Sequence, residues 1–194
     1  MRRRGFTLAE TTVAMGIMML LGGAMVAGYA AGLRFFVRTA TQGQASQQAA
    51  LAVKYMAADV QQAMAIKQGA ALPADECSTN TQLVFVAPTK DATTGFNLVP
   101  LQEGTWVRYY LADKRGTYGN NGRYLWRASR AAGESTWRTD RCLGPSVTSA
   151  YFAYLPDMQN VSRVSISVTV TPDQGGGSAA ASQSTEALLR NLQK

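Results

Sequence analysis

The sequence predicts an α+β fold, in which one long N-terminal α-helix packs on a C-terminal antiparallel β-sheet domain. Residues 11–33 contain no charged side chain. Apolar residues then recur at steps of three and four as far as residue 64, which is the spacing of one helix face. After Pro73, apolar and polar residues alternate between turn-forming segments, which is the pattern of half-buried strands.

The composition limits the chemistry available to the chain. Only 16% of its 194 residues are charged, and it contains no histidine and two cysteines. A Ser-His-Asp triad, a Cys-His nucleophile, a histidine-ligated metal and a four-cysteine zinc site are therefore excluded. The acidic pair Asp75-Glu76, and Asp113 with Asn120 and Asn121, lack EF-hand spacing and are interpreted as loop residues. We expect no enzymatic activity, no bound metal and no cofactor; a membrane-anchored periplasmic enzyme is the most distant alternative.

The uncharged run at residues 11–33 is long enough to cross a bilayer, since about 20 apolar helical residues span the hydrocarbon core. Arginines at positions 2–4 precede it and Arg34 and Arg38 follow it, so the positive-inside rule favours a cytoplasmic N-terminus only weakly. A secretory signal peptide is one alternative, but the run exceeds the usual core of about 7–15 residues and Glu10 stands among its first residues. A plain signal anchor, the other alternative, gives no reason for that carboxylate.

The segment Arg4-Gly5-Phe6-Thr7-Leu8-Ala9-Glu10, followed at once by the apolar run, resembles the cleavage and methylation signal of type IV pilins and type II secretion pseudopilins. The resemblance implies cleavage after Gly5 by a prepilin peptidase and N-methylation of the new terminus at Phe6. It also implies that, in the assembled fibre, Glu10 of one subunit contacts the terminal amine of its neighbour. Unlike many pilins, this chain has no proline in the apolar run.

The pilin fold that this resemblance implies divides the chain into four parts. A prepilin leader peptide, residues 1–5, is removed. Residues 6–33 form the transmembrane and fibre-core half of the helix, and residues 34–70 form its amphipathic stalk half. Residues 71–194 form a β-rich globular domain in the periplasm or outside the cell.

An unpaired carboxylate in hydrocarbon costs on the order of several kcal/mol, so Glu10 needs either a partner or access to water. This gives two interpretations of the residue. In the first, the ammonium of a neighbouring subunit supplies the pair only after assembly, so Glu10 sets the register between subunits. In the second, Glu10 reaches the lipid headgroups from the first helical turn, where the helix dipole also favours an acid.

The residues beyond the apolar run continue the predicted helix. Gly69 and Pro73 are expected to end it, so that its last residue lies near position 68. A helix over residues 6–68 would be about 90 Å long at 1.5 Å per residue, which far exceeds a bilayer. Its second half must therefore pack on the domain, through an apolar stripe formed by Ala49, Val53, Met56, Val60, Ala63 and Met64.

Six strands are predicted after Pro73, with a hairpin loop at residues 113–122, which are rich in turn formers. Residues 172–184 are predicted to form a flexible loop. Residues 186–194 fit either a short helix or a strand, and the ending Leu189-Arg190-Asn191-Leu192 resembles the C-terminal strand of W-type minor pilins and J-type pseudopilins, which favours a strand. The six predicted strands cover residues 82–87, 105–112, 123–129, 135–139, 147–155 and 161–171.

Cys77 and Cys142 have two interpretations. The topology implied by the resemblance places them outside the cytoplasm, where disulfides persist. We therefore expect a Cys77–Cys142 disulfide, which would close a loop of about 66 residues and stabilise the fold by about 4 kcal/mol in the chain-entropy model. Two free, buried thiols are the alternative.

The formal net charge of +7 falls on the implied cleavage, because residues 1–5 hold three arginines and the remainder has 16 basic against 12 acidic side chains. Between residues 108 and 141, basic and aromatic side chains are interleaved. This combination suits single-stranded nucleic acid, through phosphate contact and base stacking, and it equally suits the two faces of an ordinary sheet. The residues considered for nucleic-acid contact are Arg108, Arg123, Arg127 and Trp126.

The resemblance therefore implies a structural subunit, a minor pilin or pseudopilin, that joins the tip or initiation complex of a type IV pilus or a type II secretion pseudopilus. Its expected partners are other pilin or pseudopilin subunits, prepilin peptidase, and the inner membrane with its assembly platform. It is expected as a single-pass protein of the bacterial inner membrane, with a cytoplasmic N-terminus and a periplasmic domain, and in the fibre after assembly. A competence pilin that binds DNA during uptake is the alternative function.

Overall fold

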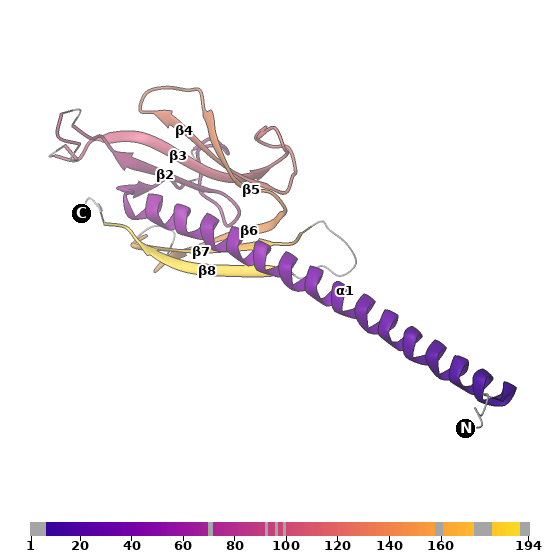
Figure 1. Cartoon of the computed structure of the whole chain (residues 1–194). Coiled ribbons are helices and arrows are strands. Elements are labelled where there is room, and N and C mark those ends of the chain that lie inside the picture. Colours follow the sequence, from indigo (N-terminus) through magenta and orange to yellow (C-terminus); the bar gives the residue numbers. More distant parts are fainter. Residues whose placement is uncertain are drawn as a thin grey trace. The chain divides into compact units, whose positions relative to one another are not determined.

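A computed structural model describes residues 7–69, 72–91, 93–95, 97–98, 100–157, 161–172 and 180–190. Within these ranges the chain forms one long helix, α1 (Leu8–Gln61), and strands in two antiparallel sheets, as Figure 1 shows. The α+β architecture predicted from the sequence is confirmed. One sheet has the strand order β1-β2-β3-β4-β5 and the other has the order β6-β7-β8. The strands are β1 (Ala65–Ile66), β2 (Leu83–Pro88), β3 (Glu103–Ala112), β4 (Tyr124–Ala131), β5 (Arg138–Gly144), β6 (Val147–Leu155), β7 (Arg163–Val170) and β8 (Ala181–Leu188).

The chain divides into two compact units, Met1–Thr41 and Gln42–Lys194. The first unit contains the N-terminal part of α1. The second unit contains the rest of α1 and both sheets. All buried apolar side chains of the described residues belong to the second unit, so the hydrophobic core lies entirely there.

The last turns of α1 complete this core with a stripe of small and apolar residues. Ala49, Val53, Met56 and Val60, four members of the predicted stripe, are buried on the helix as expected. Their spacing of three and four puts them on one face, and that face contacts both sheets. Burying one Val, Leu, Ile or Phe side chain stabilises the fold by about 1.5–3 kcal/mol. The sheet residues of the same cluster include Leu83, Phe85, Val107, Tyr109, Leu125, Phe152, Val164, Ile166 and Val168.

The helix ends earlier than the sequence predicts, at Gln61 rather than near residue 68. Ala63 and Met64 are buried, but they have left the helix. The next residues pair with β2, where the Met64 backbone N–H donates to the Val86 carbonyl at 2.8 Å and Ile66 lies opposite Phe85. Hydrogen bonds to the outer edge of β2 therefore replace those that another helical turn would have made. The sequence around residue 61 does not show that this edge is available, so the end of the helix could not be predicted from it.

Five of the six predicted strands are confirmed with small shifts, whereas the position of the fourth strand and part of the loop predicted at residues 172–184 are wrong. The fourth strand was expected at residues 135–139 but lies at Arg138–Gly144, where its pairing with β4 runs from Ser129↔Arg138 to Leu125↔Gly144. Residues 181–184 were expected in a loop but form the start of β8. Unbroken pairing with β7, from Val170↔Ala181 to Arg163↔Leu188, overrides their weak strand propensity. The strand expected over residues 186–194 is present only at residues 186–188, the end of β8. Leu189 and Arg190, two of the four residues on which the resemblance rested, lie after the strand, and residues 191–194 lie outside the described residues.

The predicted hairpin between β3 and β4 is confirmed, and its loop is organised by Asp113. The Asp113 carboxylate accepts hydrogen bonds from the backbone N–H groups of Arg115 and Thr117 and from the Asn120 side-chain amide. These bonds, led by that of Asn120, lower the pKa of Asp113. Gly122 closes the loop, since a Cβ there would lie 2.0 Å from the Ala112 carbonyl oxygen.

The expected disulfide is not present, because Cys77 and Cys142 are both free thiols. Cys77 lies in the β1–β2 connection, where its Sγ donates to the carbonyl oxygens of Gly69 and Ser78 at 3.6 and 3.5 Å. Cys142 lies on β5, the opposite edge strand of the sheet from β1, opposite Trp126 of β4. A bridge requires Cα atoms about 4.4–6.8 Å apart, and neighbouring strands alone are about 4.8 Å apart. The two thiols therefore have separate surroundings, one in the β1–β2 connection and one on β5.

Candidate functional site

The first turn of α1 holds Glu10 in a capping box with Thr7. The backbone N–H and the hydroxyl of Thr7 both donate to Glu10 Oε2, at 2.9 and 3.0 Å, and the backbone N–H of Glu10 lies 3.3 Å from the Thr7 hydroxyl oxygen. Such a pair satisfies N-terminal donors that have no partner within the helix. The sequence contains the signature, Thr-x-x-Glu, but Thr7 was not selected from it. Gly5 and Phe6, the predicted cleavage and methylation residues, lie outside the described residues.

The part of α1 that follows exposes an apolar surface along its length. Large apolar side chains such as Leu8, Met18 and Leu20 are mostly exposed, and the apolar window of the helix is 0% buried within the chain. Its length and composition suffice for one membrane crossing. An exposed apolar surface of this extent needs a cover of lipid or of other protein.

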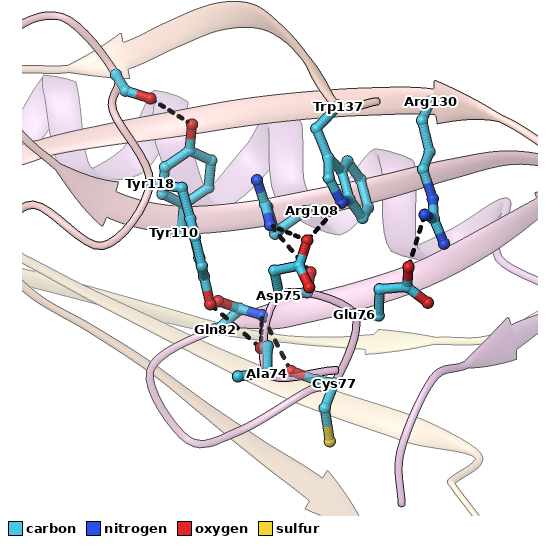
Figure 2. A network of polar contacts seen from close by, with 11 residues as sticks. Ala74, Asp75, Glu76, Cys77, Gln82, Arg108, Tyr110, Tyr118, Arg130 and Trp137 are labelled. Carbon is cyan, nitrogen blue, oxygen red and sulfur yellow. Dashed lines mark hydrogen bonds and ion pairs between the residues drawn. The ribbon is translucent and has the colours of Figure 1, made fainter. Parts of the chain in front are cut away.

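A layer of arginines and aromatic rings covers one face of the five-stranded sheet (Figure 2). Trp106, Arg108 and Tyr110 alternate along β3 with Val107 and Tyr109, which face the α1 core, so the layer lies on the other face. Its members stack as alternating cations and rings, an arrangement in which each close contact contributes about 0.5–2 kcal/mol. The cation-to-centroid distances are 4.6 Å for Lys67–Trp106, 4.4 Å for Arg130–Trp106, 4.9 Å for Arg130–Trp137, 4.3 Å for Arg108–Trp137 and 4.0 Å for Arg108–Tyr118.

Residues 74–77, here called the acidic strap, supply the charges that this layer needs (Figure 2). Arg108, only 3% exposed, donates to the Asp75 carbonyl at 3.0 Å and lies 3.6 Å from its carboxylate. Arg130, 8% exposed, donates to the Glu76 carboxylate at 2.7 Å. Burial lowers the pKa of the Arg108 guanidinium, and the nearby tyrosines and Asp75 oppose that shift. The strap itself is held by Gln82, whose side-chain amide donates to the carbonyls of Ala74 and Cys77.

This arrangement assigns internal partners to the residues considered for nucleic-acid contact. Arg108 is buried beneath the strap, and Trp126 donates its indole N–H to the Asp113 carbonyl at 2.9 Å. Arg127 is paired with Asp59 and Asp140. Arg123 is exposed and also makes an interaction within the chain. A nucleic acid would have to displace ion pairs to reach Arg108 or Arg127, so the structure favours the interpretation of this stretch as two faces of a sheet.

A second polar cluster joins α1 to the other face of the sheet. Asp59 on α1 accepts hydrogen bonds at one oxygen from the Tyr109 hydroxyl at 2.6 Å and from Arg127 Nε at 2.8 Å. Arg127 also pairs with Asp140 of β5. Burial, followed by the charge of Asp59, raises the pKa of Tyr109, and the Asp59 contact raises the pKa of Arg127 against the effect of burial. Asp59 was not selected from the sequence; its signal is a single acid beside the apolar stripe.

Two pockets meet at this cluster, and both are lined by Asp59 and Arg127. The larger, of about 580 Å³, is bordered by β2, β3 and β4. The smaller, of about 340 Å³, is lined also by Tyr55, Arg141 and Leu143. Volumes of this size suit a small ligand or one side chain of another protein.

Comparisons of the chain with protein-family models, with curated proteins and with solved structures find no match. Among the described residues, no group of three or more Cys, Asp or Glu side chains is placed to hold a metal ion. A functional proposal therefore depends on the N-terminal segment and on the surfaces described above.

Proposed function

We propose that this chain is a minor pilin or pseudopilin, a structural subunit that is cleaved by prepilin peptidase and assembled into the tip or initiation complex of a type IV pilus or type II secretion pseudopilus. The observation that carries the proposal is the segment from Arg4 to Glu10 placed directly before an exposed apolar helix. The packing of the later turns of α1 on antiparallel sheets supports it.

The Thr7–Glu10 contact supplies a physical role for the first turn. Before assembly, the two donors of Thr7 stabilise the Glu10 carboxylate at the entrance to the membrane. Cleavage after Gly5 creates an ammonium at Phe6, and the ammonium of a neighbouring subunit then offers Glu10 an opposite charge. The Thr7 donors are neutral dipoles, whereas the ammonium carries a full positive charge. In a medium of low dielectric constant the attraction between two full charges is the stronger one, so assembly gives Glu10 a stronger partner.

Processing is the first test of the proposal. The full chain is produced in membranes with and without a prepilin peptidase, and the intact masses are compared. We expect the peptidase to remove Met1–Gly5 and the product to carry one additional methyl group at Phe6. A Gly5→Leu variant serves as the matched control and should keep its leader. An unchanged wild-type mass in the presence of an active peptidase would refute the proposal.

Glu10 provides the second test, in which processing and assembly are measured separately. Glu10→Gln keeps the size of the side chain and the capping acceptor but removes the charge, so we expect normal cleavage and reduced incorporation into sheared fibres. Glu10→Asp, which keeps the charge on a shorter side chain, should retain more incorporation. Equal incorporation of wild type and Glu10→Gln would show that the capping role alone explains Glu10.

A further inference from the structure

Arg141 of β5 is exposed and lies beside a group of ion pairs that does not include it. It lies directly opposite Arg127 of β4, and like charges in directly opposite positions destabilise a sheet. Arg127 is compensated by Asp59 and Asp140. Within the part of the chain that the structure describes, the contact recorded for Arg141 is with the ring of Tyr55, at 4.5 Å, and no carboxylate lies within 4.0 Å of its guanidinium.

Arg141 and Tyr55 both line the pocket of about 340 Å³. The two carboxylates in this pocket, Asp59 and Asp140, are already bound to Arg127. The group left for a ligand is therefore the Arg141 guanidinium, with the apolar side chain of Leu143 also in the lining. The Arg141 Cζ lies over the Tyr55 ring, and the N–H groups of a guanidinium match a carboxylate through two parallel hydrogen bonds.

We propose that this pocket binds the carboxylate of an aspartate or glutamate side chain presented by a neighbouring polypeptide. The adjoining surface of α1 supports a polypeptide as the source. Leu51 and Tyr55, one helical turn apart, are 52% and 44% exposed although they lie in the second, folded unit. A segment with an apolar residue beside an acidic one could contact Leu51 and Tyr55 with the first and form an ion pair with Arg141 through the second. That the neighbour is another subunit of a fibre rests on the proposed function, whereas the carboxylate chemistry does not.

The carboxylate chemistry is tested on the full chain in detergent by NMR of the arginine side chains. The probe is N-acetylglutamate α-methylamide, and N-acetylglutamine α-methylamide is its uncharged counterpart. We expect saturable shifts of the Arg141 Nε–Hε signal with a dissociation constant on the order of millimolar, as befits one charged contact. Arg141→Gln should weaken binding at least about tenfold, as measured on the signals of Tyr55 and Leu143, because it removes the paired donors. Arg138→Gln, which removes an exposed arginine of the same strand, should leave binding unchanged.

Three outcomes would overturn the proposal: shifts that do not saturate, equal binding of the glutamine probe, or equal binding to Arg141→Gln. Inorganic phosphate at the same concentration should bind more weakly, since it makes no use of Leu143 and Tyr55. Phosphate binding as tight as that of the glutamate probe would identify a general anion site and would also count against the proposal.

A second measurement addresses the neighbouring subunit. Arg141→Glu should leave leader removal unchanged, because the pocket lies far along the sequence from residues 1–10, but should lower incorporation into fibres. Normal incorporation of Arg141→Glu would refute a subunit contact at this pocket. Failure of the wild-type chain to be processed would instead refute the proposed function, and the probe titration would still decide whether the pocket binds a carboxylate.

Discussion

Replacing Asp59 by alanine removes the one carboxylate oxygen that connects α1 to both β3 and β4. Tyr109 is buried, so its hydroxyl would lose its charged acceptor, a cost of about 1–3 kcal/mol. The Asp59 and Arg127 side chains are 29% and 26% exposed, so solvent screens their ion pair and its loss adds only about 1 kcal/mol. Arg127 keeps Asp140 as a partner. We therefore expect Asp59→Ala to lower the free energy of unfolding by about 2–4 kcal/mol, a large part of the usual total of about 5–15 kcal/mol.

The free energy of unfolding is measured by denaturant titration of the full chain in mild detergent. The fluorescence of Trp106, Trp126 and Trp137 reports the transition, because all three lie in the second unit. Glu134→Ala is the matched control: it removes an acid of a surface pair with Arg138, whose side chains are 43% and 75% exposed, and should cost less than about 0.5 kcal/mol.

A double-mutant cycle with Tyr109→Phe measures how much of the cost comes from the Tyr109 hydroxyl that loses its acceptor. In the Tyr109→Phe background no hydroxyl remains to lose its partner, so Asp59→Ala should cost less by about 1–3 kcal/mol. The reasoning fails if Asp59→Ala costs no more than Glu134→Ala, or if its cost is the same in both backgrounds.

Three further predictions concern other parts of the second unit. Burial raises the pKa of Tyr109 and of Tyr154, and Asp59 adds to the effect at Tyr109. The unfolded chain releases these hydroxyl protons near pH 10, whereas the folded chain keeps them. The free energy of unfolding is therefore unaffected below that pH and falls above it by up to about 1.4 kcal/mol per pH unit for each tyrosine. In Tyr154→Phe, the free energy of unfolding should therefore fall less steeply with pH above about pH 10 than in the wild type. An unchanged slope would contradict this cause. Glu76→Ala leaves the buried guanidinium of Arg130 without its partner and should cost about 3–5 kcal/mol, with hydrogen exchange rising first around the acidic strap; exchange rising equally in β7 would instead indicate global loss of structure. Gly122→Ala places a Cβ against the Ala112 carbonyl and should lower the midpoint of thermal unfolding, whereas Gly43→Ala, at an open site on α1, should raise stability by up to about 1 kcal/mol; the opposite order would refute the contact argument.

Local patterns in the sequence were sufficient for the elements whose burial follows a simple period. The stripe of Ala49, Val53, Met56 and Val60 was predicted because a helix repeats its contact face every three or four residues, and the structure buries all four. The strand at residues 147–155 was predicted with its observed bounds, since burial alternates from Ala150 onward and only a register shift between Val147 and Ser149 interrupts it. The segment from Arg4 to Glu10 and the apolar run after it could likewise be identified because their residues are contiguous in the sequence.

Contacts between residues distant in sequence decided the remainder. The end of α1 at Gln61 depends on the free edge of β2, and the length of β8 depends on its pairing with β7. Arg108 and Arg130 were seen in the sequence as basic residues among aromatics, but their acids lie 33 and 54 positions away in the strap. The same limit applies to the cysteines, whose positions in the fold no local pattern gives and which remain free thiols.

By itself, then, the sequence determined the α+β class, the membrane-length helix, the apolar stripe and most strands, because these depend on periodicity and on neighbouring residues. Only the tertiary structure decided which charges are paired and which are not. It placed Arg127 between Asp59 and Asp140 and left Arg141, directly opposite, over the ring of Tyr55 and outside these ion pairs. The physical reason is that an ion pair depends on a distance of a few ångströms between two elements, and the spacing of residues within one strand or helix does not give that distance.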